Sequence, residues 1–323
     1  VVATPCPLLI AAPVAFLGGM SRAARGGIIV KYAGVLEQLS RVKTVAFDKT
    51  GTLTYGRPSL VGVRTAGSFT GDQVLALAAS AEQYSSHVLA ASVMEAAHHR
   101  GLMFETATEA TEFATHGVRA RFDSRDVVVG KPNFVAESAP GVVETDLASG
   151  ELAIYVGVAG EFAGALVMSD PIRGETRRTL AELKELGVTR TVMLTGDALA
   201  TAEHIAAEAG LTDVRAECLP ADKVEAVRSL PVRPVMMVGD GVNDAPVLAV
   251  ADVGIAMGAR GSTAAGESAD VVIILDDLSK AASAVRIGQR TIKVALQSIW
   301  IGIGLSVALM VAAAAGYIPA IAG

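Results

Sequence analysis

In the second half of the chain, short hydrophobic runs alternate with amphipathic segments that are closed by glycine. The amphipathic segments Glu175–Leu186 and Ala198–Ala209 are predicted to be helices, because each is followed at once by a glycine, a common residue after a helix end. The hydrophobic runs are predicted to be buried strands, at residues 191–194, 234–238, 253–256 and 271–275. Strands that alternate with helices predict a parallel sheet with helices on both faces.

The pattern changes between residues 58 and 167, where hairpins replace the alternation of strands and helices. The predicted elements are a strand, two helices and two hairpins, at residues 59–65, 71–79, 86–99, 118–129 and 152–167. This succession indicates an α+β domain inserted into the parallel-sheet domain. We therefore expect residues 41–57 and 168–278 to form one domain and residues 58–167 to form another.

Two long hydrophobic runs near the ends of the chain indicate membrane helices. Residues 1–20 and 294–315 contain no charged residue, and each run is about long enough to cross much of a bilayer. Basic residues flank both runs on the side that joins the middle of the chain; they are Arg22, Arg25, Lys31, Arg286, Arg290 and Lys293. Because lysine and arginine gather on the cytoplasmic side, we expect a multi-pass protein of the cell membrane with cytoplasmic middle domains. Residues 1–40 and 279–323 would each form a membrane helix with its stalk, the second capped by Ser279.

Composition narrows the class of protein. The 323 residues are 51% hydrophobic and carry a formal net charge of −6, so charge gives no support for a nucleic-acid partner. The two cysteines, Cys6 and Cys218, lie far apart and do not make a disulfide framework, which favours a reduced, cytoplasm-facing protein. The first hydrophobic run begins at Val1 without a basic leader, which favours a segment of a longer protein over a signal peptide.

The candidate chemistry follows the short hydrophobic run Val45–Phe47. This run predicts a buried strand that delivers Asp48 to the carboxyl edge of the sheet, where open α/β folds bind ligands. A carboxylate there can attack phosphorus and form an aspartyl-phosphate. Thr50 and Thr52 offer hydroxyls, and Gly51 lets backbone amides approach phosphate oxygens. The alternative is a capping aspartate at an ordinary strand end.

Two further predicted strands are also followed by acidic residues, namely Asp197 after one and Asp240 with Asp244 after the other. Carboxylates at neighbouring strand ends repel one another unless a cation lies among them, and Mg²⁺ binds one or two carboxylates together with phosphate oxygens. Lys223 could neutralise a transferring phosphoryl group, and Asn243 could fix the phosphate. A solvated lysine and a turn asparagine are the alternatives.

Together these loops resemble the haloacid dehalogenase-like phosphorylation domain of P-type ATPases, in the order in which that family has them. The matching segments are Asp48-Lys49-Thr50-Gly51-Thr52-Leu53-Thr54, Thr195-Gly196-Asp197 and Gly239-Asp240-Gly241-Val242-Asn243-Asp244-Ala245-Pro246. The resemblance implies a Rossmannoid α/β phosphorylation domain with an inserted α+β nucleotide-binding domain, flanked by transmembrane helices. It implies that ATP phosphorylates Asp48. The residues implied to hold Mg²⁺ are Asp48, Thr50, Asp240 and Asp244. Those implied to act in catalysis or to bind phosphate are Thr195, Gly196, Asp197, Lys223 and Asn243.

A second signature resembles the nucleotide domain of heavy-metal pumps. It usually reads Ser-Glu-His-Pro, and here it reads Ser85-Ser86-His87-Val88. The residues implied to bind ATP are Glu82, His87, Gly117 and Gly130, with His87 at the adenine end. Ser86 and Val88 depart from the signature, and Thr115 stands where the first glycine of a Gly-x-Gly loop is usual. Because threonine has a Cβ, the close backbone approach at this position is in doubt, and ATP is expected to bind with altered affinity.

Within the family, a cysteine flanked by prolines before the phosphorylation loop is similar to that of heavy-metal pumps. Here the segment reads Pro5-Cys6-Pro7, in which the prolines free helix carbonyls and Cys6 offers a soft sulfur ligand. The resemblance implies that Cys6 binds the transported transition-metal cation, and a buried structural cysteine is the alternative. The last helix carries Gln297, Ser298 and Ser306, which match neither copper pumps nor zinc pumps, so the metal stays open.

These observations lead to one main hypothesis, an ATP-driven heavy-metal pump in the lipid bilayer. This chain is expected to lack the pump's earlier membrane helices, its last helix and its actuator domain. Phosphatases of the same fold usually carry an acidic residue at the position of Thr50, so a threonine there argues against a membrane-tethered phosphatase. A nucleotide-sensing relic and a P-type ATPase for a different substrate, such as potassium or lipid, are further alternatives.

Overall fold

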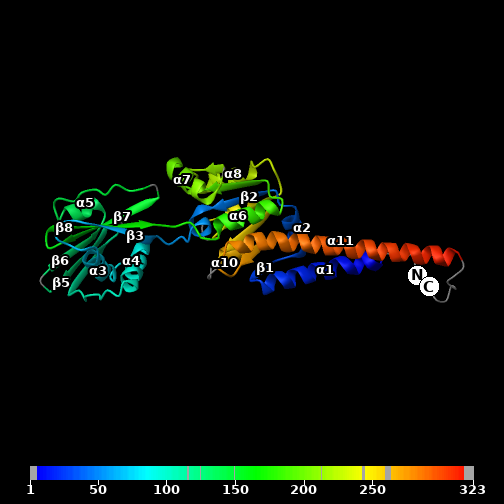
Figure 1. Cartoon of the computed structure of the whole chain (residues 1–323), viewed down its shortest axis with the longest axis horizontal. Coiled ribbons are helices and arrows are strands. Elements are labelled where there is room, and N and C mark those ends of the chain that lie inside the picture. Colours follow the sequence, from blue (N-terminus) through cyan, green and yellow to red (C-terminus); the bar gives the residue numbers. More distant parts are fainter. Residues whose placement is uncertain are drawn as a thin grey trace. The chain divides into compact units, whose positions relative to one another are not determined.

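The computed structural model describes residues 6–114, 116–123, 125–148, 150–211, 213–241, 244–258 and 263–315, and the chain divides into two compact units (Figure 1). Unit 1 consists of Val1–Leu53 and Arg173–Gly323, and unit 2 consists of Thr54–Ile172. The chain leaves unit 1 after Leu53 and returns to it at Arg173. These two residues are neighbours in space, because the backbone N–H of Arg173 donates to the carbonyl of Leu53 at 2.9 Å. Asp48 and Asp240 therefore belong to the same unit.

Unit 1 is built on a seven-stranded sheet with the order β1-β13-β12-β11-β2-β9-β10. Its strands are β1 (Ile28–Val30), β2 (Thr44–Asp48), β9 (Arg190–Leu194), β10 (Asp213–Arg215), β11 (Val235–Gly239), β12 (Val253–Met257) and β13 (Val271–Ile273). The strands are parallel except for β1, which is antiparallel to β13, so the predicted parallel sheet is confirmed. β2 lies between β9 and β11, where the strand order reverses and the carboxyl ends of all three strands meet.

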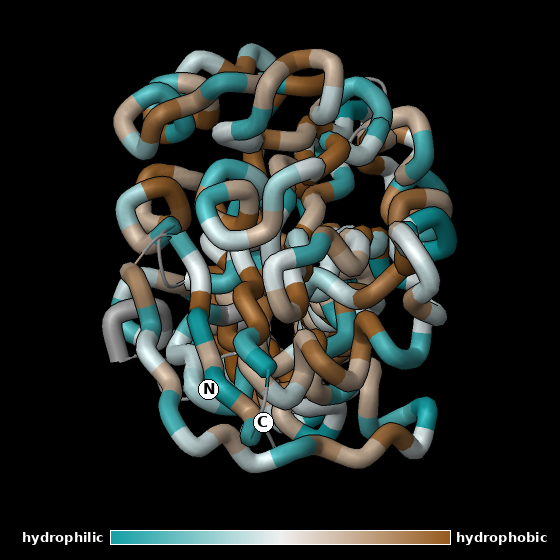
Figure 2. The backbone as a smooth tube through the Cα atoms, turned by 90° about the vertical axis from the view of Figure 1, so that its left-hand side faces the viewer, coloured by the Kyte–Doolittle hydropathy of each residue, from teal (hydrophilic) through white to brown (hydrophobic). Residues whose placement is uncertain are grey.

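Helices cover both faces of this sheet. The helices of unit 1 are α1 (Cys6–Arg25), α2 (Ala33–Arg41), α6 (Thr176–Glu185), α7 (Leu199–Ala209), α8 (Pro220–Arg228), α9 (Ala245–Val250), α10 (Thr263–Ser268) and α11 (Ser279–Ala314), and α1 and α11 extend away from the sheet (Figure 1). Ala46 and its cross-strand neighbour Met237 pack against one group of helices that includes α8 and α9, while Phe47, the next residue of β2, points to the opposite face and is equally buried. Hydrophobic and hydrophilic residues alternate along the helical coils in Figure 2, as in α6, where Leu183 is buried and Arg178 is exposed.

Among the described residues, α11 is the one helix that is long and apolar enough to cross a membrane. α1 runs beside α11 (Figure 1), and the two approach closely at Gly19, where an ideal Cβ would lie 2.3 Å from the Oγ1 of Thr291. Residues 1–5 of the predicted N-terminal membrane run lie outside the described part. The predicted cap is wrong, because Ser279 is the first residue of α11 and its N–H donates to the Oδ1 of Asp277 at 2.9 Å.

Unit 2 is built on a six-stranded antiparallel sheet with the order β3-β8-β7-β6-β5-β4. Its elements are β3 (Ser59–Thr65), α3 (Gly71–Glu82), α4 (Val88–His99), β4 (Glu109–Phe113), β5 (Gly117–Phe122), β6 (Arg125–Gly130), α5 (Pro132–Ala136), β7 (Glu151–Val158) and β8 (Glu161–Ser169). The predicted strand at residues 59–65 and both predicted hairpins are present, as β3, β5–β6 and β7–β8. β4 was not predicted.

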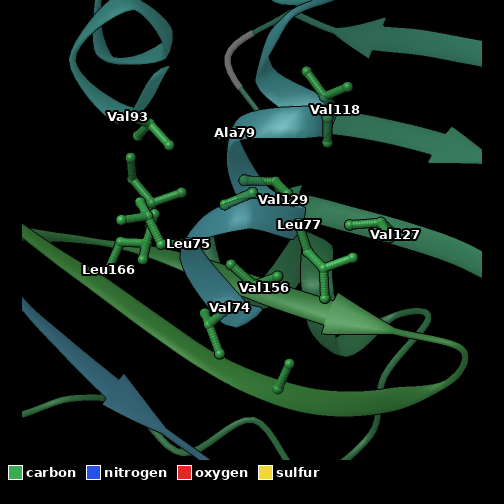
Figure 3. Close-up of a cluster of buried hydrophobic side chains, with 14 of the residues drawn as sticks. Val74, Leu75, Leu77, Ala79, Val93, Val118, Val127, Val129, Val156 and Leu166 are labelled. Atoms are coloured by element: carbon green, nitrogen blue, oxygen red, sulfur yellow. The ribbon is translucent and has the colours of Figure 1, made fainter. Parts of the chain in front are cut away.

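The core of unit 2 explains the run of three valines in β6. Val127 and Val129 face α3 and belong to one hydrophobic cluster with Leu75 and Leu77 of that helix (Figure 3), whereas Val128 points to the other face and packs with Phe134 of α5. All three valines are buried because helices cover both faces of this part of the sheet. The packed sheet thereby fixes the ends of β5 and β6, where two of the predicted ligand-binding glycines lie.

Candidate catalytic centre and ligand cavity

Asp48 is the last residue of β2 and is only 6% exposed. The Nζ of Lys223, in the first turn of α8, donates to the Oδ1 of Asp48 and, at 3.2 Å, to the Oδ1 of Asp244. Asp244 directly precedes α9 and is 2% exposed. The structure thus brings together three residues that are far apart in the sequence, and it shares one ammonium between two buried carboxyl groups.

The charges of this cluster are not balanced. The pKa of Asp48 is raised to about 6, because burial and the charge of Asp244 together outweigh the opposing effect of Lys223. Burial also raises the pKa of Asp244, again against the attraction of Lys223. Burial by itself lowers the pKa of Lys223, but the two carboxylates outweigh it and hold that pKa above its ordinary value. The cluster is therefore electronegative at neutral pH, and an additional cation would relieve the repulsion.

Asp240 lies against the loop that follows Asp48. An ideal Cβ on Gly51 would lie 3.4 Å from the Oδ2 of Asp240, and Gly51 has a φ of +72°, which favours glycine. Mg²⁺ fits this donor set, because carboxylate and backbone carbonyl oxygens are its preferred protein ligands. The described residues contain no ready-made cage of three or more His, Cys, Asp or Glu, which suits an ion that keeps several waters and phosphate oxygens.

The loop after β9 is held to the Asp48 loop by charge. The Nζ of Lys49 lies 2.7 Å from the Oδ2 of Asp197, and the hydroxyl of Thr195 donates to the same oxygen at 2.9 Å. The backbone N–H of Asp197 in turn donates to the hydroxyl of Thr195 at 3.1 Å. The predicted residues Thr195 and Asp197 thus form one small network beside Asp48, whereas Asn243 lies outside the described residues.

Arg173 is a residue of this region that the sequence analysis missed. Its guanidinium is 1% exposed and donates to the carbonyl of Gly51 at 3.2 Å and to the Oδ1 of Asp276 at 2.5 Å. The segment around Arg173 has no hydrophobic periodicity, and both partners are more than a hundred residues away, so no local signal could have shown this contact.

Unit 2 contains a cavity of about 230 Å³. The residues that line it come from α3, from α4 and the turn before it, and from the sheet with its adjoining loops; they are Glu82, Ser85, His87, Leu89, Glu112, Phe113, His116, Gly117, Gly130, Lys131, Leu152, Ala153 and Ile154. The four predicted ATP-binding residues, Glu82, His87, Gly117 and Gly130, therefore lie around one cavity. Apolar side chains such as Leu89 and Ile154, combined with a few polar groups, are typical of a small-molecule site.

Glu82 is the buried polar group of this cavity. It is 6% exposed, and its Oε2 has no hydrogen-bond partner among the described residues. The pKa of Glu82 is raised to about 7, because burial and the charge of Glu112 outweigh a hydrogen bond from Ser85 that lowers it. A buried acceptor without a donor is costly, so the site is suited to a ligand that brings a donor group.

The two glycines of the cavity are required by sterics. Gly117 and Gly130 face each other across β5 and β6, and an ideal Cβ on them would lie 2.0 Å from the carbonyl of Val129 and 2.2 Å from that of His116. Only residues without a side chain fit this approach. Thr115, the departure from the Gly-x-Gly pattern, lies outside the described residues.

His87 does not lie inside a helix, so the predicted helix at residues 86–99 begins too early. His87 is the N-cap of α4, with an extended backbone, and its Nδ1 accepts from the N–H of Leu89 at 3.3 Å. An acceptor at Nδ1 leaves the proton of a neutral imidazole on Nε2, so the Nε2–H is a donor. The cap thus orients the ring at the edge of the cavity.

Known proteins match the part of the chain that carries these residues. The profile of the family described as haloacid dehalogenase-like hydrolase matches residues 42–252. The chain is 37% identical over 321 residues to the cadmium, zinc and cobalt-transporting ATPase of Bacillus subtilis (strain 168), which covers 98% of this chain and 45% of that protein. It is 38% identical over 322 residues to the copper-transporting ATPase 2 of Rhizobium meliloti (strain 1021), with 97% of this chain and 39% of that protein covered.

A solved structure gives a similar result. The crystal structure of a zinc-transporting PIB-type ATPase in its E2.Pi state matches with a TM-score of 0.83 and 33% identity, over 97% of this chain and 52% of that one. The chain thus spans less than half the length of these two curated relatives and about half of the solved chain.

Proposed function

This chain belongs to the haloacid dehalogenase-like hydrolase family, and we propose that it is the catalytic part, with adjoining membrane helices, of an ATP-driven pump for heavy-metal cations. The observation that carries the proposal is the buried Asp48, paired with Lys223 at the carboxyl edge of the sheet beside Asp240 and Asp244. The similarity over nearly the whole chain to metal-transporting ATPases supports it.

In the proposed reaction, an oxygen of Asp48 attacks the γ-phosphorus of ATP in line. The new Asp48 O–P bond forms as the bond from the γ-phosphorus to the bridging oxygen breaks, and ADP leaves with that electron pair. Lys223 stabilises the charge on the transferring phosphoryl group. Asp48, the carbonyl of Thr50 and Asp240 would hold Mg²⁺, with Asp244 nearby, and the ion supplies further charge neutralisation when bound. A pKa of about 6 leaves Asp48 ionised, and so nucleophilic, at neutral pH.

Thr50 decides between a pump and a phosphatase. A phosphatase needs a general base close to the acyl phosphate to activate water, and a threonine side chain cannot serve as one. The carboxyl group of Asp197, which is the nearest described acidic group on the β9 loop, is engaged by Lys49 at 2.7 Å and by the hydroxyl of Thr195 at 2.9 Å. The phosphoenzyme should therefore persist until a base from another part of the full-length protein, its actuator domain, reaches it.

The cavity of unit 2 is the proposed site for the adenine of ATP. The exocyclic amine of adenine is a donor, which the Oε2 of Glu82 lacks, and the Nε2–H of His87 offers a donor to the ring nitrogens. Gly117 and Gly130 leave the floor of the cavity without side chains. Unit 2 would thus be the nucleotide-binding domain.

Transport is proposed to take place in a multi-pass membrane domain to which α1 and α11 belong, with the middle domains in the cytoplasm. Cys6 begins α1, and its sulfur is the proposed ligand of the transported transition metal. The two relatives are named as transporters of cadmium, zinc and cobalt and of copper, and the chain is nearly equally identical to both, so the proposal extends to the heavy-metal class. In the full-length protein, Cys6→Ala should remove metal-stimulated ATPase activity and leave nucleotide binding intact.

The test is phosphorylation of this chain by γ-labelled Mg-ATP. We expect an acid-stable label that hydroxylamine removes, that Asp48→Asn lacks, and that accumulates to at most one phosphate per chain. Continuous release of phosphate over many turnovers would instead favour the phosphatase. Absence of any label in the wild type would contradict the role of Asp48.

A further inference from the structure

We propose that Glu112, on β4, is a positioning residue for adenine recognition: it fixes the turn Ser85–His87 so that His87 meets the base in one orientation. The proposal rests on the proposed nucleotide site in unit 2. Glu112 is separated from this turn by more than twenty residues and matches no part of the signature that the sequence carries.

The contacts of Glu112 all converge on this turn. Its Oε1 accepts from the backbone N–H of Ser86 at 2.9 Å, from the hydroxyl of Ser85 at 3.0 Å and from the hydroxyl of Ser86 at 3.2 Å. Its Oε2 accepts from the hydroxyl of Ser86 at 3.1 Å. One carboxylate therefore holds two successive residues, through both backbone and side chain.

The turn needs such an anchor because its position decides where the imidazole lies. His87 directly follows Ser86, and its N–H donates to the hydroxyl of Ser85 at 3.1 Å, so the two serines hold His87 from one side. From the other side, the N–H of Leu89 holds the ring through Nδ1. If Glu112 is removed, the serine hydroxyls and the N–H of Ser86 lose their shared acceptor, and the turn gains conformational freedom that binding must remove.

Glu112 also belongs to the cavity itself. Its side chain lines the cavity together with Glu82 and His87, and the hydroxyl of Ser85 makes hydrogen bonds with both Glu82 and Glu112. The N–H of Ser86 and the serine hydroxyls hold the pKa of Glu112 below its usual range, so Glu112 is ionised at neutral pH. In the usual signature a carboxylate occupies position 86, whereas in this chain a serine stands there and the carboxylate comes from β4.

The register of β4 places Glu112 next to the cavity. Glu112 pairs with Val118 across β4 and β5, one residue beyond the Gly117 that faces Gly130. The strand that carries the carboxylate is therefore in register with the glycines of the cavity. Glu109, on the same strand, is paired instead with Arg121 at 3.3 Å and does not line the cavity, so it offers a matched control.

The experiment is calorimetric titration of the whole chain in detergent with β,γ-methylene-ATP and with β,γ-methylene-GTP. Glu112→Ala should lower the affinity for the adenine analogue about tenfold, because the turn loses a charge-assisted hydrogen-bond acceptor. The variant should also show a smaller preference for adenine over guanine. Glu112→Gln keeps an oxygen acceptor for the N–H of Ser86 and should stay within about threefold of the wild type. Glu109→Ala should bind as the wild type does.

Ser86→Ala gives a second route that leaves Glu112 in place. This variant removes both contacts between the Ser86 hydroxyl and Glu112 but keeps the N–H of residue 86. It should lower the affinity for the adenine analogue about threefold. Wild-type affinity in Glu112→Ala, or in Ser86→Ala if the first variant does not fold, would overturn the proposal. Equal losses for both analogues in Glu112→Ala would also overturn it, because they would show a general effect on unit 2. A wild type that binds neither analogue would instead refute the nucleotide site itself.

Discussion

Replacing Asp48 by asparagine should stabilise unit 1 at neutral pH, although Asp48 is the proposed nucleophile. Asparagine has the shape of a protonated aspartate, and it can still accept a hydrogen bond from Lys223 through its Oδ1. The substitution therefore removes the charge and leaves the packing in place. A stabilising effect at the central residue of the catalytic site is a direct sign that the site stores electrostatic repulsion.

The magnitude follows from the pKa of Asp48, which is about 6 in the folded protein and 3.8 for an unperturbed aspartate. The difference of about 2 corresponds to about 3 kcal/mol of free energy of unfolding. Because the folded-state pKa is the higher one, the protonated form stabilises the fold fully below about pH 3.8, and this stabilisation is lost as the pH rises through 6. Wild type and Asp48→Asn should thus be equally stable near pH 4, and the variant should be more stable by about 3 kcal/mol at pH 8.

Thermal unfolding of both proteins in detergent, followed by circular dichroism between pH 4 and pH 8, measures this difference. For a unit of this size, about 3 kcal/mol corresponds to a Tm higher by about 6 to 12 °C in the variant at pH 8. Glu203→Gln, on the exposed side of α7, removes one negative charge elsewhere in unit 1 and should change Tm little. Millimolar Mg²⁺ should raise the Tm of the wild type more than that of Asp48→Asn. A variant that is no more stable than the wild type at pH 8 would refute the reasoning.

Three further predictions concern single side chains. Lys223→Met should lower phosphoenzyme formation by a factor on the order of 10² or more, measured as acid-stable label, because the transferring phosphoryl group loses its fixed cation. Affinity for β,γ-methylene-ATP should fall as the pH drops from 8 to 6 through the Glu82 pKa of about 7, since protonation removes the negative charge that strengthens the hydrogen bond from the adenine amine; Glu112 and His87 also face the cavity, so the part that disappears in Glu82→Gln is the part due to Glu82. Arg173→Ala should lower the free energy of unfolding by about 3 kcal/mol, measured by denaturant titration, because it removes a buried side chain together with its charge-assisted hydrogen bonds to Gly51 and Asp276.

The strands of unit 1 could be predicted from the sequence because strands that are buried on both faces consist almost entirely of apolar residues. β2, β9 and β11 are covered on both faces, so they appear as uninterrupted apolar runs, and the polar residue that follows each run marks the edge of the sheet. Asp48, Asp197 and Asp240 could be placed at one edge for this reason. The same rule does not apply to an exposed edge strand such as β4, whose five residues are all exposed and show no alternation.

The parts that could not be predicted depend on contacts between distant segments. Glu112 was missed because β4 was missed, and its partner Ser86 was interpreted only as a departure from a signature. His87 was placed inside a helix because helix propensity does not show that its own ring caps the helix. Arg173 gave no local signal, since its acceptors Gly51 and Asp276 lie far from it in sequence.

Arg173 also shows how the Asp48 loop is joined to the membrane helix. Its guanidinium donates to the carbonyl of Gly51 in that loop and to Asp276, which lies two residues before Leu278, the N-cap of α11. Glu175 accepts from the N–H of Leu278 at 3.3 Å, so two residues of one short segment hold both the loop and the start of the helix. A buried guanidinium cannot lose an acceptor without a large cost, and a displacement of the Gly51 carbonyl must therefore move Arg173 or break the contact. A shift of the Gly51 carbonyl would therefore be passed through Arg173 to Asp276, two residues before the N-cap of α11.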